Sequence, residues 1–515
     1  MRDILYLDAN ATTPVLPQAA EAAQRVLREQ FGNPSSVHEP GQRARACMEA
    51  VRARAGQVLG VRHGRVVFTS GATEALQTAI LSVLADVAAR QRAGRPCGRW
   101  LLYGGTEHKA VPEALAHWNT VLGTGLSLRA IPVDPQGRHD LAALRALAPQ
   151  AELVCTMAVN NETGVISDLA GIRAAIPRGE GAPRWLVDGV QALGKVDVDL
   201  DGLAIDYAAF SGHKLYAPKG IGLLYLRDGA PRTPLIVGGG QEAGLRSGTE
   251  NLPAIAALGA VLDALDDGVS FRRDDELRAM RDALVESLRA AFPGILFNTP
   301  LALAVPTTLN VSLPEPQAAS LRAIIEAAGI AASGGSACSA AQARPSHVLE
   351  AMGLPLWRSA TAVRLSFGPA DSPRSIARAC ERIRACAVPA QTAAPVAPAA
   401  EAADPTSALD RAALAQLLQR HPAARLVDVR EPAEQAAADA AEALGLPVDA
   451  VPLSQFVDHV PRWLQAPDQP LVFICRSGAR AARAAGSLRS LGHAGAWHLQ
   501  GGLMAAAAAE ALVSA

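Results

Sequence analysis

Short apolar runs alternate with longer stretches rich in alanine and leucine over the first ~385 residues of the chain. The runs at residues 65–69, 153–157 and 185–188 contain β-branched and aliphatic side chains, as buried strands do. The stretches between them have the composition of crossover helices. The pattern therefore predicts an α/β fold in which a parallel sheet is covered by helices.

A second, smaller unit follows a change in composition at residues 388–407. Proline, alanine, glutamine and threonine dominate there and the apolar periodicity stops, which is typical of a semi-extended linker. Beyond it, apolar runs at 425–429 and 471–475 alternate with helical stretches. We expect a first unit over residues 1–387 and a small α/β domain over residues 408–515.

Composition narrows the possible functions. The chain has 48 Lys+Arg against 49 Asp+Glu, so neither a nucleic-acid-binding surface nor an acidic tail is indicated, and a small-molecule partner is favoured. No uncharged apolar run approaches the length that spans a bilayer, and the N-terminus has no apolar core of signal-peptide length. We expect a cytoplasmic protein that binds neither membranes nor metals and whose seven cysteines are mostly plain thiols.

Candidate chemistry lies where three of the apolar runs end. Residues 69–76, TSGATEAL, lead from a run into a helical stretch, and the free N–H groups of such a turn can bind phosphate. Asp188 ends the apolar run at 185–188. The end of a strand opens into the crevice where α/β proteins bind ligands, and a carboxylate there could keep a pyridine nitrogen protonated. The segment SGHK at 211–214 supplies Lys214, an amine that could form an imine with an aldehyde cofactor.

Each of these features has a simpler structural explanation. The turn can be an ordinary connection capped by Thr73, Asp188 can be a helix N-cap, and Lys214 can be a solvated surface charge. Their occurrence in one chain, at the ends of plausible successive strands, favours a cofactor site instead.

Eight segments closely resemble, in order, the pyridoxal-phosphate (PLP) cysteine desulfurases. They are YLDANATTP at 6–14, GNPSSVH at 32–38, FTSGATE at 68–74, EHK at 107–109, NNETG at 160–164, SGHK at 211–214, RSGT at 246–249 and GSACS at 335–339. The resemblance covers about residues 4–385 and implies a fold-type I homodimer. It also implies a large domain of about residues 15–252 and a small domain made of residues 1–14 and 253–387.

The resemblance implies a role around PLP for each matching residue. Lys214 forms the imine with the cofactor and His108 stacks on its pyridine ring. Asp188 pairs with the ring nitrogen, and Gln191 approaches the phenolic oxygen. The phosphate is implied to be held by Ala72, Thr73, Ser211 and His213, with Thr249 contributed by the neighbouring subunit.

The same resemblance implies the substrate and the reaction. L-cysteine is expected to contact Asn33, Asn161 and Arg364, and Arg364 is expected to hold its carboxylate as a bidentate fork. Cys338 is implied to take the substrate sulfur as a persulfide, which leaves L-alanine. The small residues at 332–337 permit the loop movement that this task requires, and the loop length fits the long-loop group of the family.

The sequence offers no such role for the other cysteines of the first unit. Cys155 and Cys47 are interpreted as buried hydrophobic residues, the commonest environment of a free cysteine. No role is indicated for Cys97, Cys380 or Cys386.

The C-terminal unit has a sulfur-binding pattern of its own. An apolar run delivers Cys475 into a short loop before a helical stretch, and the loop N–H groups and helix dipole there should lower the thiol pKa and stabilise a persulfide. The persulfide loop is formed by Arg476, Ser477, Gly478, Ala479 and Arg480. The unit resembles single-domain rhodaneses over about residues 408–510. The segments at 426–431 and 499–503 also support this resemblance. The alternative is that Cys475 is a remnant in an inactive module.

Joined, the two units lead to the hypothesis that the persulfide on Cys338 passes to Cys475. A linker of ~20 residues would raise the local concentration of the acceptor thiol. The sequence leaves open whether transfer occurs within a chain or between subunits. It also leaves open the final acceptor, which can be a protein or a small thiol.

Two other function classes stay open at this point. One is a related PLP enzyme such as a selenocysteine lyase or a small-molecule aminotransferase, although Cys338 disfavours the aminotransferase. The other is a sulfur-carrier scaffold that binds PLP without turning over cysteine.

Overall fold

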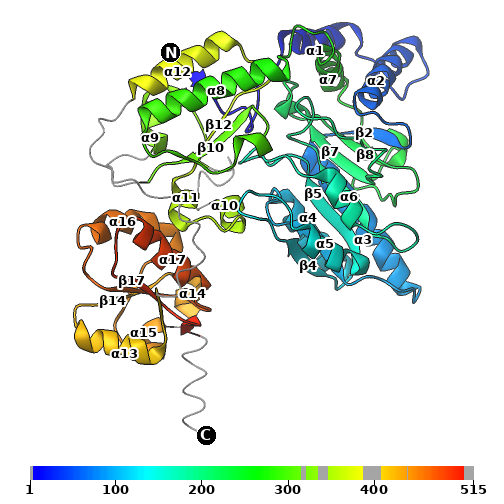
Figure 1. Cartoon of the computed structure of the whole chain (residues 1–515). Helices are drawn as coiled ribbons and strands as arrows, with labels where there is room; N and C mark the ends of the chain where they lie inside the picture. Colours follow the sequence, from blue (N-terminus) through cyan, green and yellow to red (C-terminus); the bar gives the residue numbers. More distant parts are fainter. Residues whose placement is uncertain (1–3, 315–320, 335–345, 387–406, 438, 504–515) are drawn as a thin grey trace.

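The computed structural model describes residues 4–314, 321–334, 346–386, 407–437 and 439–503. Figure 1 shows a large unit built on a wide sheet, a smaller layer beside it, and a separate C-terminal domain. This is the α/β architecture that the sequence predicts.

A seven-stranded sheet forms the centre of the large unit, in the order β2-β8-β7-β6-β5-β3-β4. Only β8 runs antiparallel to its neighbours β2 and β7; the other pairs are parallel. All residues of β5, β7 and β8 are buried, as expected for strands covered on both faces. The bounds are β2 (Arg65–Thr69), β3 (Trp100–Gly104), β4 (Ser127–Ile131), β5 (Ala151–Met157), β6 (Arg184–Asp188), β7 (Tyr207–Ser211) and β8 (Gly222–Leu226).

Alternate strand residues pack into two separate cores, one on each face of this sheet. Val67 and Leu153 pack with α3 (Ala72–Arg92) and α4 (Ala110–Leu122). Their neighbours Phe68 and Val154 point the other way, because successive side chains of a strand alternate between faces. That opposite core is completed by α1 (Pro17–Glu29), α2 (Glu39–Val58), α5 (Leu141–Leu147), α6 (Leu169–Ala175) and α7 (Leu252–Ala264).

Helix α3 is long and apolar enough to cross a membrane by length and composition. Most of it is nevertheless buried in the core above the sheet, as is usual for the central helix of an α/β domain. Within the described part of the chain, no other helix meets both criteria.

The smaller layer has its own sheet and core. Strand β10 (Thr308–Ser312) lies between β9 (Leu296–Phe297) and β12 (Val363–Ser366) and is antiparallel to both. The N-terminal strand β1 (Leu5–Tyr6) pairs with β11 (Ile330–Ala331) and places Leu5 in this core. The helices of the layer are α8 (Asp274–Ala291), α9 (Leu321–Ala327), α10 (His347–Ala351), α11 (Leu356–Thr361) and α12 (Pro373–Ala385).

The exact division between the two layers stays a prediction. The sequence-based boundary lies near residue 252, but α7 directly after it packs against α1 and α2 in the core of the large sheet. The described residues of the small-layer core are the N-terminal strand and segments from α8 onward.

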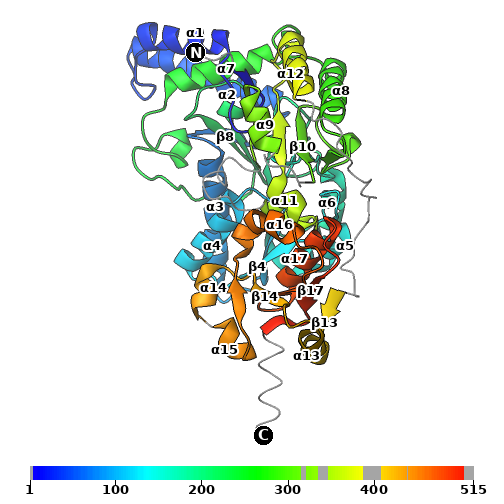
Figure 2. The same ribbon diagram turned by 90° about the vertical axis from the view of Figure 1, so that its left-hand side faces the viewer.

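The C-terminal domain contains a parallel five-stranded sheet in the order β13-β17-β16-β14-β15. Its strands are β13 (Ala408–Leu409), β14 (Arg425–Asp428), β15 (Val448–Ala450), β16 (Leu471–Ile474) and β17 (Ala496–Leu499). Its helices are α13 (Arg411–Arg420), α14 (Pro432–Ala437), α15 (Ala440–Leu444), α16 (Phe456–Leu464) and α17 (Ala479–Ser490). Figure 1 shows this domain next to α10 and α11, and Figure 2 shows it next to α11.

Candidate active site

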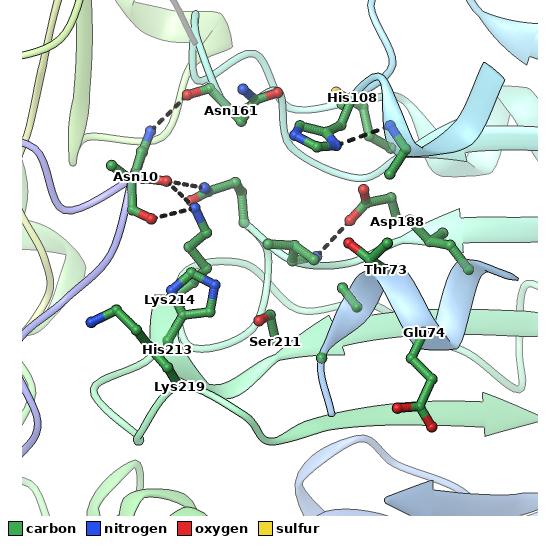
Figure 3. A pocket seen from close by; sticks show the side chains of 18 of the residues that line it. Asn10, Thr73, Glu74, His108, Asn161, Asp188, Ser211, His213, Lys214 and Lys219 are labelled. Carbon is green, nitrogen blue, oxygen red and sulfur yellow. Dashed lines mark hydrogen bonds between the residues drawn. The ribbon is translucent and has the colours of Figure 1, made fainter. Parts of the chain in front are cut away.

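A cavity of about 480 Å³ opens at one edge of the seven-stranded sheet. Met157, Asp188 and Ser211, the last residues of the neighbouring strands β5, β6 and β7, all line it. Ligands of open α/β sheets bind at this carboxyl edge, and the volume suits a small molecule. Figure 3 shows the polar side chains that converge on the cavity.

The N-terminus of α3 forms one end of the cavity. Ala72 and Thr73 occupy its first turn, where backbone N–H groups have no partner within the helix. Ser211 lies beside them, and the backbone of Gly222 passes so close that a Cβ there would lie 2.6 Å from the Cα of Gly71. The structure therefore brings together the turn and the serine that were predicted to hold phosphate.

Asp188 places a buried carboxylate at the floor of the cavity. Its side chain accepts the N–H of Val190 at 3.0 Å, and no helix begins there, so the N-cap explanation does not apply. Burial raises the pKa of Asp188 to about 6, against the opposing effects of the Val190 N–H and the Lys214 charge. A buried carboxylate with this pKa is stabilised as an anion by a cation in the cavity.

Lys214 enters the cavity from the turn that follows β7, and the N-terminal segment holds it. Its Nζ donates to the carbonyl oxygens of Asn10 at 2.6 Å and Ala11 at 2.7 Å (Figure 3). Burial and the Lys214 charge lower the pKa of His213 to about 4. The same two causes lower the pKa of His108, so that near neutral pH its ring is uncharged and suited to stacking.

Arg364 lines the cavity from β12 and is almost fully buried, at 1% exposed. From its position in the sequence alone, Arg364 would be expected on the exposed face of a strand. The structure contradicts this expectation, because all residues of β12 are buried. It pairs with Asp8 at 2.6 Å and donates to the carbonyl oxygen of Asn161 at 2.9 Å. Its Nε is buried without a hydrogen-bond partner in the described part of the chain, which suits it to a substrate carboxylate.

Sequence reasoning missed Asn10 and Lys195. The Nζ of Lys195 donates to the side-chain oxygens of Gln191 at 2.7 Å and Asn10 at 3.3 Å. Burial, together with the charges of Lys214 and Arg364, lowers the pKa of Lys195 to about 7.

A signal for Lys195 was present in the composition. The whole sequence contains only four lysines among 48 Lys+Arg, namely Lys109, Lys195, Lys214 and Lys219. Lys214 and Lys219 line the cavity, Lys195 bonds to its lining, and Lys109 follows His108. A chain that uses arginine almost everywhere else retains lysine where a smaller, titratable amine is useful.

A second candidate site lies in the C-terminal domain, at the end of β16. Cys475 is buried, and its Sγ accepts the N–H of Ala481, in the first turn of α17, at 3.4 Å. Gly502 packs on this loop so closely that a Cβ would lie 2.2 Å from the Cys475 carbonyl oxygen. Arg480 forms an ion pair with Glu434 at 2.6 Å, and this arginine lowers the pKa of Glu434 to about 2.

Comparison with known proteins identifies both units. The model of the family "Aminotransferase class-V" matches residues 5–378, and the model "Rhodanese-like domain" matches residues 410–509. A cysteine desulfurase from Cereibacter sphaeroides is 38% identical over 380 residues, covering 73% of this chain and 94% of the relative. The chain belongs to the cysteine desulfurases of aminotransferase class V.

Further relatives support the same family. A cysteine desulfurase from Gluconacetobacter diazotrophicus is 37% identical over 73% of this chain and 91% of its own length. A solved structure titled "NIFS-LIKE PROTEIN" is 32% identical with a TM-score of 0.64 over 74% of this chain and 98% of its own. "SspA in complex with cysteine" is 28% identical with a TM-score of 0.59, over 71% of this chain and 99% of its own.

The desulfurases of this class are PLP-dependent, and the cavity fits that cofactor. The first turn of α3 has N–H groups for a phosphate, and Asp188 is a buried carboxylate that a protonated ring nitrogen would stabilise. Lys214 supplies the amine, and the uncharged ring of His108 supplies a flat face. Each is a residue that the sequence predicted for PLP.

Two predicted site residues of the desulfurase are described by the structure but do not line this cavity. Asn33 is exposed, lies outside the lining, and accepts the N–H of Ser35 at 2.9 Å, so the structure does not place it at the substrate. Thr249 is also exposed, and its role in a neighbouring subunit stays a prediction. Cys338 lies outside the described residues.

The described cysteines of the desulfurase unit are all free thiols. Cys155 is buried in the core, as predicted, and burial raises its pKa well above the usual value. Cys380 is buried as well. Cys47 was predicted to be buried but is half-buried against the edge of the core, and Cys97 and Cys386 are also half-buried.

We predict that Lys195 fixes the orientation of the Gln191 amide. The Gln191 side-chain oxygen is held by Lys195, and one of its amide N–H groups donates to the backbone oxygen of Asn10 at 3.1 Å, so the second N–H is the group that can face the phenolic oxygen of PLP. Lys195→Met should weaken PLP binding about fivefold, since one net hydrogen bond contributes about 1 kcal/mol. Fluorescence titration of the apoenzyme measures this affinity.

Lys195→Gln is the matched control because it retains an N–H donor, and its affinity should stay within about twofold of the wild type. An unchanged affinity in Lys195→Met would show that Gln191 needs no such support.

Proposed function

We propose that this desulfurase converts L-cysteine to L-alanine with a persulfide on Cys338 and then passes the sulfane sulfur to Cys475 of its own rhodanese-like domain. The observation that carries the second step is the sulfur of Cys475 at the N-terminus of α17, where the N–H of Ala481 points at it. A helix N-terminus stabilises the negative charge of a thiolate or persulfide.

The residues of the desulfurase cavity have separate roles in the conversion of L-cysteine to L-alanine. PLP, when bound, supplies an electron sink that makes the α proton of the substrate removable. Arg364 binds the substrate carboxylate and so orients that proton toward Lys214, whose amine removes it. The backbone oxygens of Asn10 and Ala11 accept hydrogen bonds from the Lys214 amine and so hold it in the cavity whenever it is free.

Sulfur leaves the substrate without an external oxidant. The thiolate of Cys338 attacks the substrate sulfur, the carbon–sulfur bond breaks, and its electron pair stays with the carbon, which is then protonated to give alanine. In the second step the thiolate of Cys475 attacks the outer sulfur of the persulfide. The sulfur–sulfur bond of Cys338 breaks, Cys338 leaves as a thiolate, and the persulfide now resides on Cys475.

Two further properties belong to the proposal. The enzyme is proposed to be a cytoplasmic homodimer in which the exposed Thr249 completes the phosphate site of the neighbouring subunit. A buried position for Thr249 in the assembled dimer would follow, although it is exposed in the single chain.

The test is a persulfide map. The protein is reacted with sulfur-labelled L-cysteine, and persulfides are located by mass spectrometry in the wild type, Cys338→Ser and Cys475→Ser. We expect label on both cysteines of the wild type, on Cys338 alone in Cys475→Ser, and on neither in Cys338→Ser. Undiminished label on Cys475 in the absence of Cys338 would disprove the relay.

A further inference from the structure

In the described part of the chain, the rhodanese-like domain contacts the desulfurase through an apolar residue of α11. Leu356, the first residue of α11, is 1% exposed and belongs to the core cluster of the C-terminal domain, together with Ala484 and Leu488 of α17. The backbone N–H of Leu356 donates to the Oγ of the buried Ser487 at 2.9 Å. A leucine from one domain that completes the core of another marks a specific interface.

Charged groups next to this apolar residue are also arranged across the interface. Burial raises the pKa of Glu350 of α10, the positive charge of Arg483 of α17 opposes this effect, and the like charge of Glu431 adds to it. Arg480, which was predicted to be in the persulfide loop, lies in the first turn of α17 and interacts electrostatically with Glu434, the Cys475 thiol and Glu431. Arg483 and Glu431 of the C-terminal domain therefore lie on the side of this domain that faces α10, and α17 contacts α11 (Figure 1).

The docking surface follows directly after the segment that contains Cys338. Ser346 caps α10, and its hydroxyl donates to the buried Glu162 at 2.5 Å, next to Asn161 of the cavity lining. Cys338 precedes Ser346 by eight residues, so a fully extended chain would place it no farther than about 29 Å from the start of α10. In one chain, α10 thus lies between the PLP cavity and the Cys475 domain.

We propose that α10 and α11 form a docking surface for the rhodanese-like domain of the same chain, so that sulfur passes from Cys338 to Cys475 within one chain. This inference rests on the proposed function, because it specifies the partner in the relay. Docking orients the acceptor thiol, and the covalent connection raises its local concentration.

Hybrid assemblies test the intrachain route. Chains with Cys338→Ser and chains with Cys475→Ser are co-expressed with different tags, and assemblies that contain both are purified and reacted with labelled L-cysteine. Label can then reach Cys475 only from another chain. We expect less than about a tenth of the wild-type label per Cys475, and more than that would overturn the intrachain route.

The wild type, measured in the same experiment, distinguishes a failure of the intrachain inference from a failure of the proposed relay. If Cys475 is labelled in the wild type and equally in the hybrids, the relay stands and the intrachain inference fails. If Cys475 is not labelled in the wild type, the proposed function itself fails and takes the inference with it.

A second experiment tests the docking surface in the full-length chain. Leu356→Asp should lower the initial rate of Cys475 labelling about tenfold, because a charge in the apolar interface favours the undocked state. Alanine release and thiosulfate-to-cyanide transfer should stay at wild-type rates, which shows that both domains are folded. Val121→Asp, at a side chain of α4 that is 59% exposed, is the matched control and should leave labelling unchanged.

Leu356→Ala provides a milder version if the aspartate variant loses either of those two activities. It should reduce labelling in the same direction. Labelling at the wild-type rate in a folded Leu356 variant would overturn docking at α11.

Discussion

Replacing Lys214 by alanine will abolish the release of L-alanine from L-cysteine. In the described structure the amine of Lys214 is held by two backbone oxygens of the N-terminal segment, and in the proposed reaction it both attaches PLP and takes the α proton. Losing the nucleophile and the base together should lower turnover by at least about 10⁴-fold, since general base catalysis alone contributes 10²–10⁴. Alanine is quantified after incubation with L-cysteine.

Lys214→Arg is the informative companion to this variant. It retains the positive charge beside Asp188 but provides no amine that can bond to an aldehyde, so it should be as inactive as the alanine variant. Transfer from thiosulfate to cyanide by the Cys475 domain should be unchanged in both variants, which controls for folding. Turnover above about one hundredth of the wild-type rate in either variant contradicts the assignment.

Replacing Asp188 by asparagine should have the second largest effect. Asparagine retains the size of the side chain but removes the negative charge that a protonated ring nitrogen would meet at the floor of the cavity. We expect turnover to fall about 10²–10³-fold, the typical loss when one preorganised electrostatic contact is removed. The absorbance maximum of bound PLP should shift as well, because the ring loses its charged partner.

The matched control for this change is Asp168→Asn. Asp168 caps α6 by accepting the N–H of Gly171 at 2.8 Å and does not line the cavity, so its loss should affect stability without changing turnover or the PLP spectrum. Equal turnover in Asp188→Asn and the wild type would mean that the ring nitrogen needs no anionic partner here.

Much of the first site could be predicted from sequence because its chemistry depends on residue type and position at the end of a strand. Asp188, Ser211 and the turn before α3 follow apolar runs that are recognisable one at a time. Parallel strands then bring their carboxyl ends to one edge, so residues far apart in sequence share a cavity without further information.

Other parts of the site depend on contacts that have no local signature. The pairing of Arg364 with Asp8 joins residues 356 positions apart, and Lys214 is held by carbonyl oxygens of residues more than 200 positions earlier. Backbone acceptors carry no sequence information, because every residue has one. The contribution of the N-terminal segment to the lysine therefore required the folded structure.

The sequence by itself determined the two families of domains, and it predicts the cofactor lysine and the cysteine at each end of the proposed relay. Those features rest on short motifs whose chemistry tolerates few other residues. Only the tertiary structure decided that Lys195 supports Gln191, that Asn33 lies away from the cavity of its own chain, and that Leu356 enters the core of the C-terminal domain. These outcomes depend on how separate cores pack against each other, and hydrophobic periodicity specifies which face of an element is buried but not against which partner.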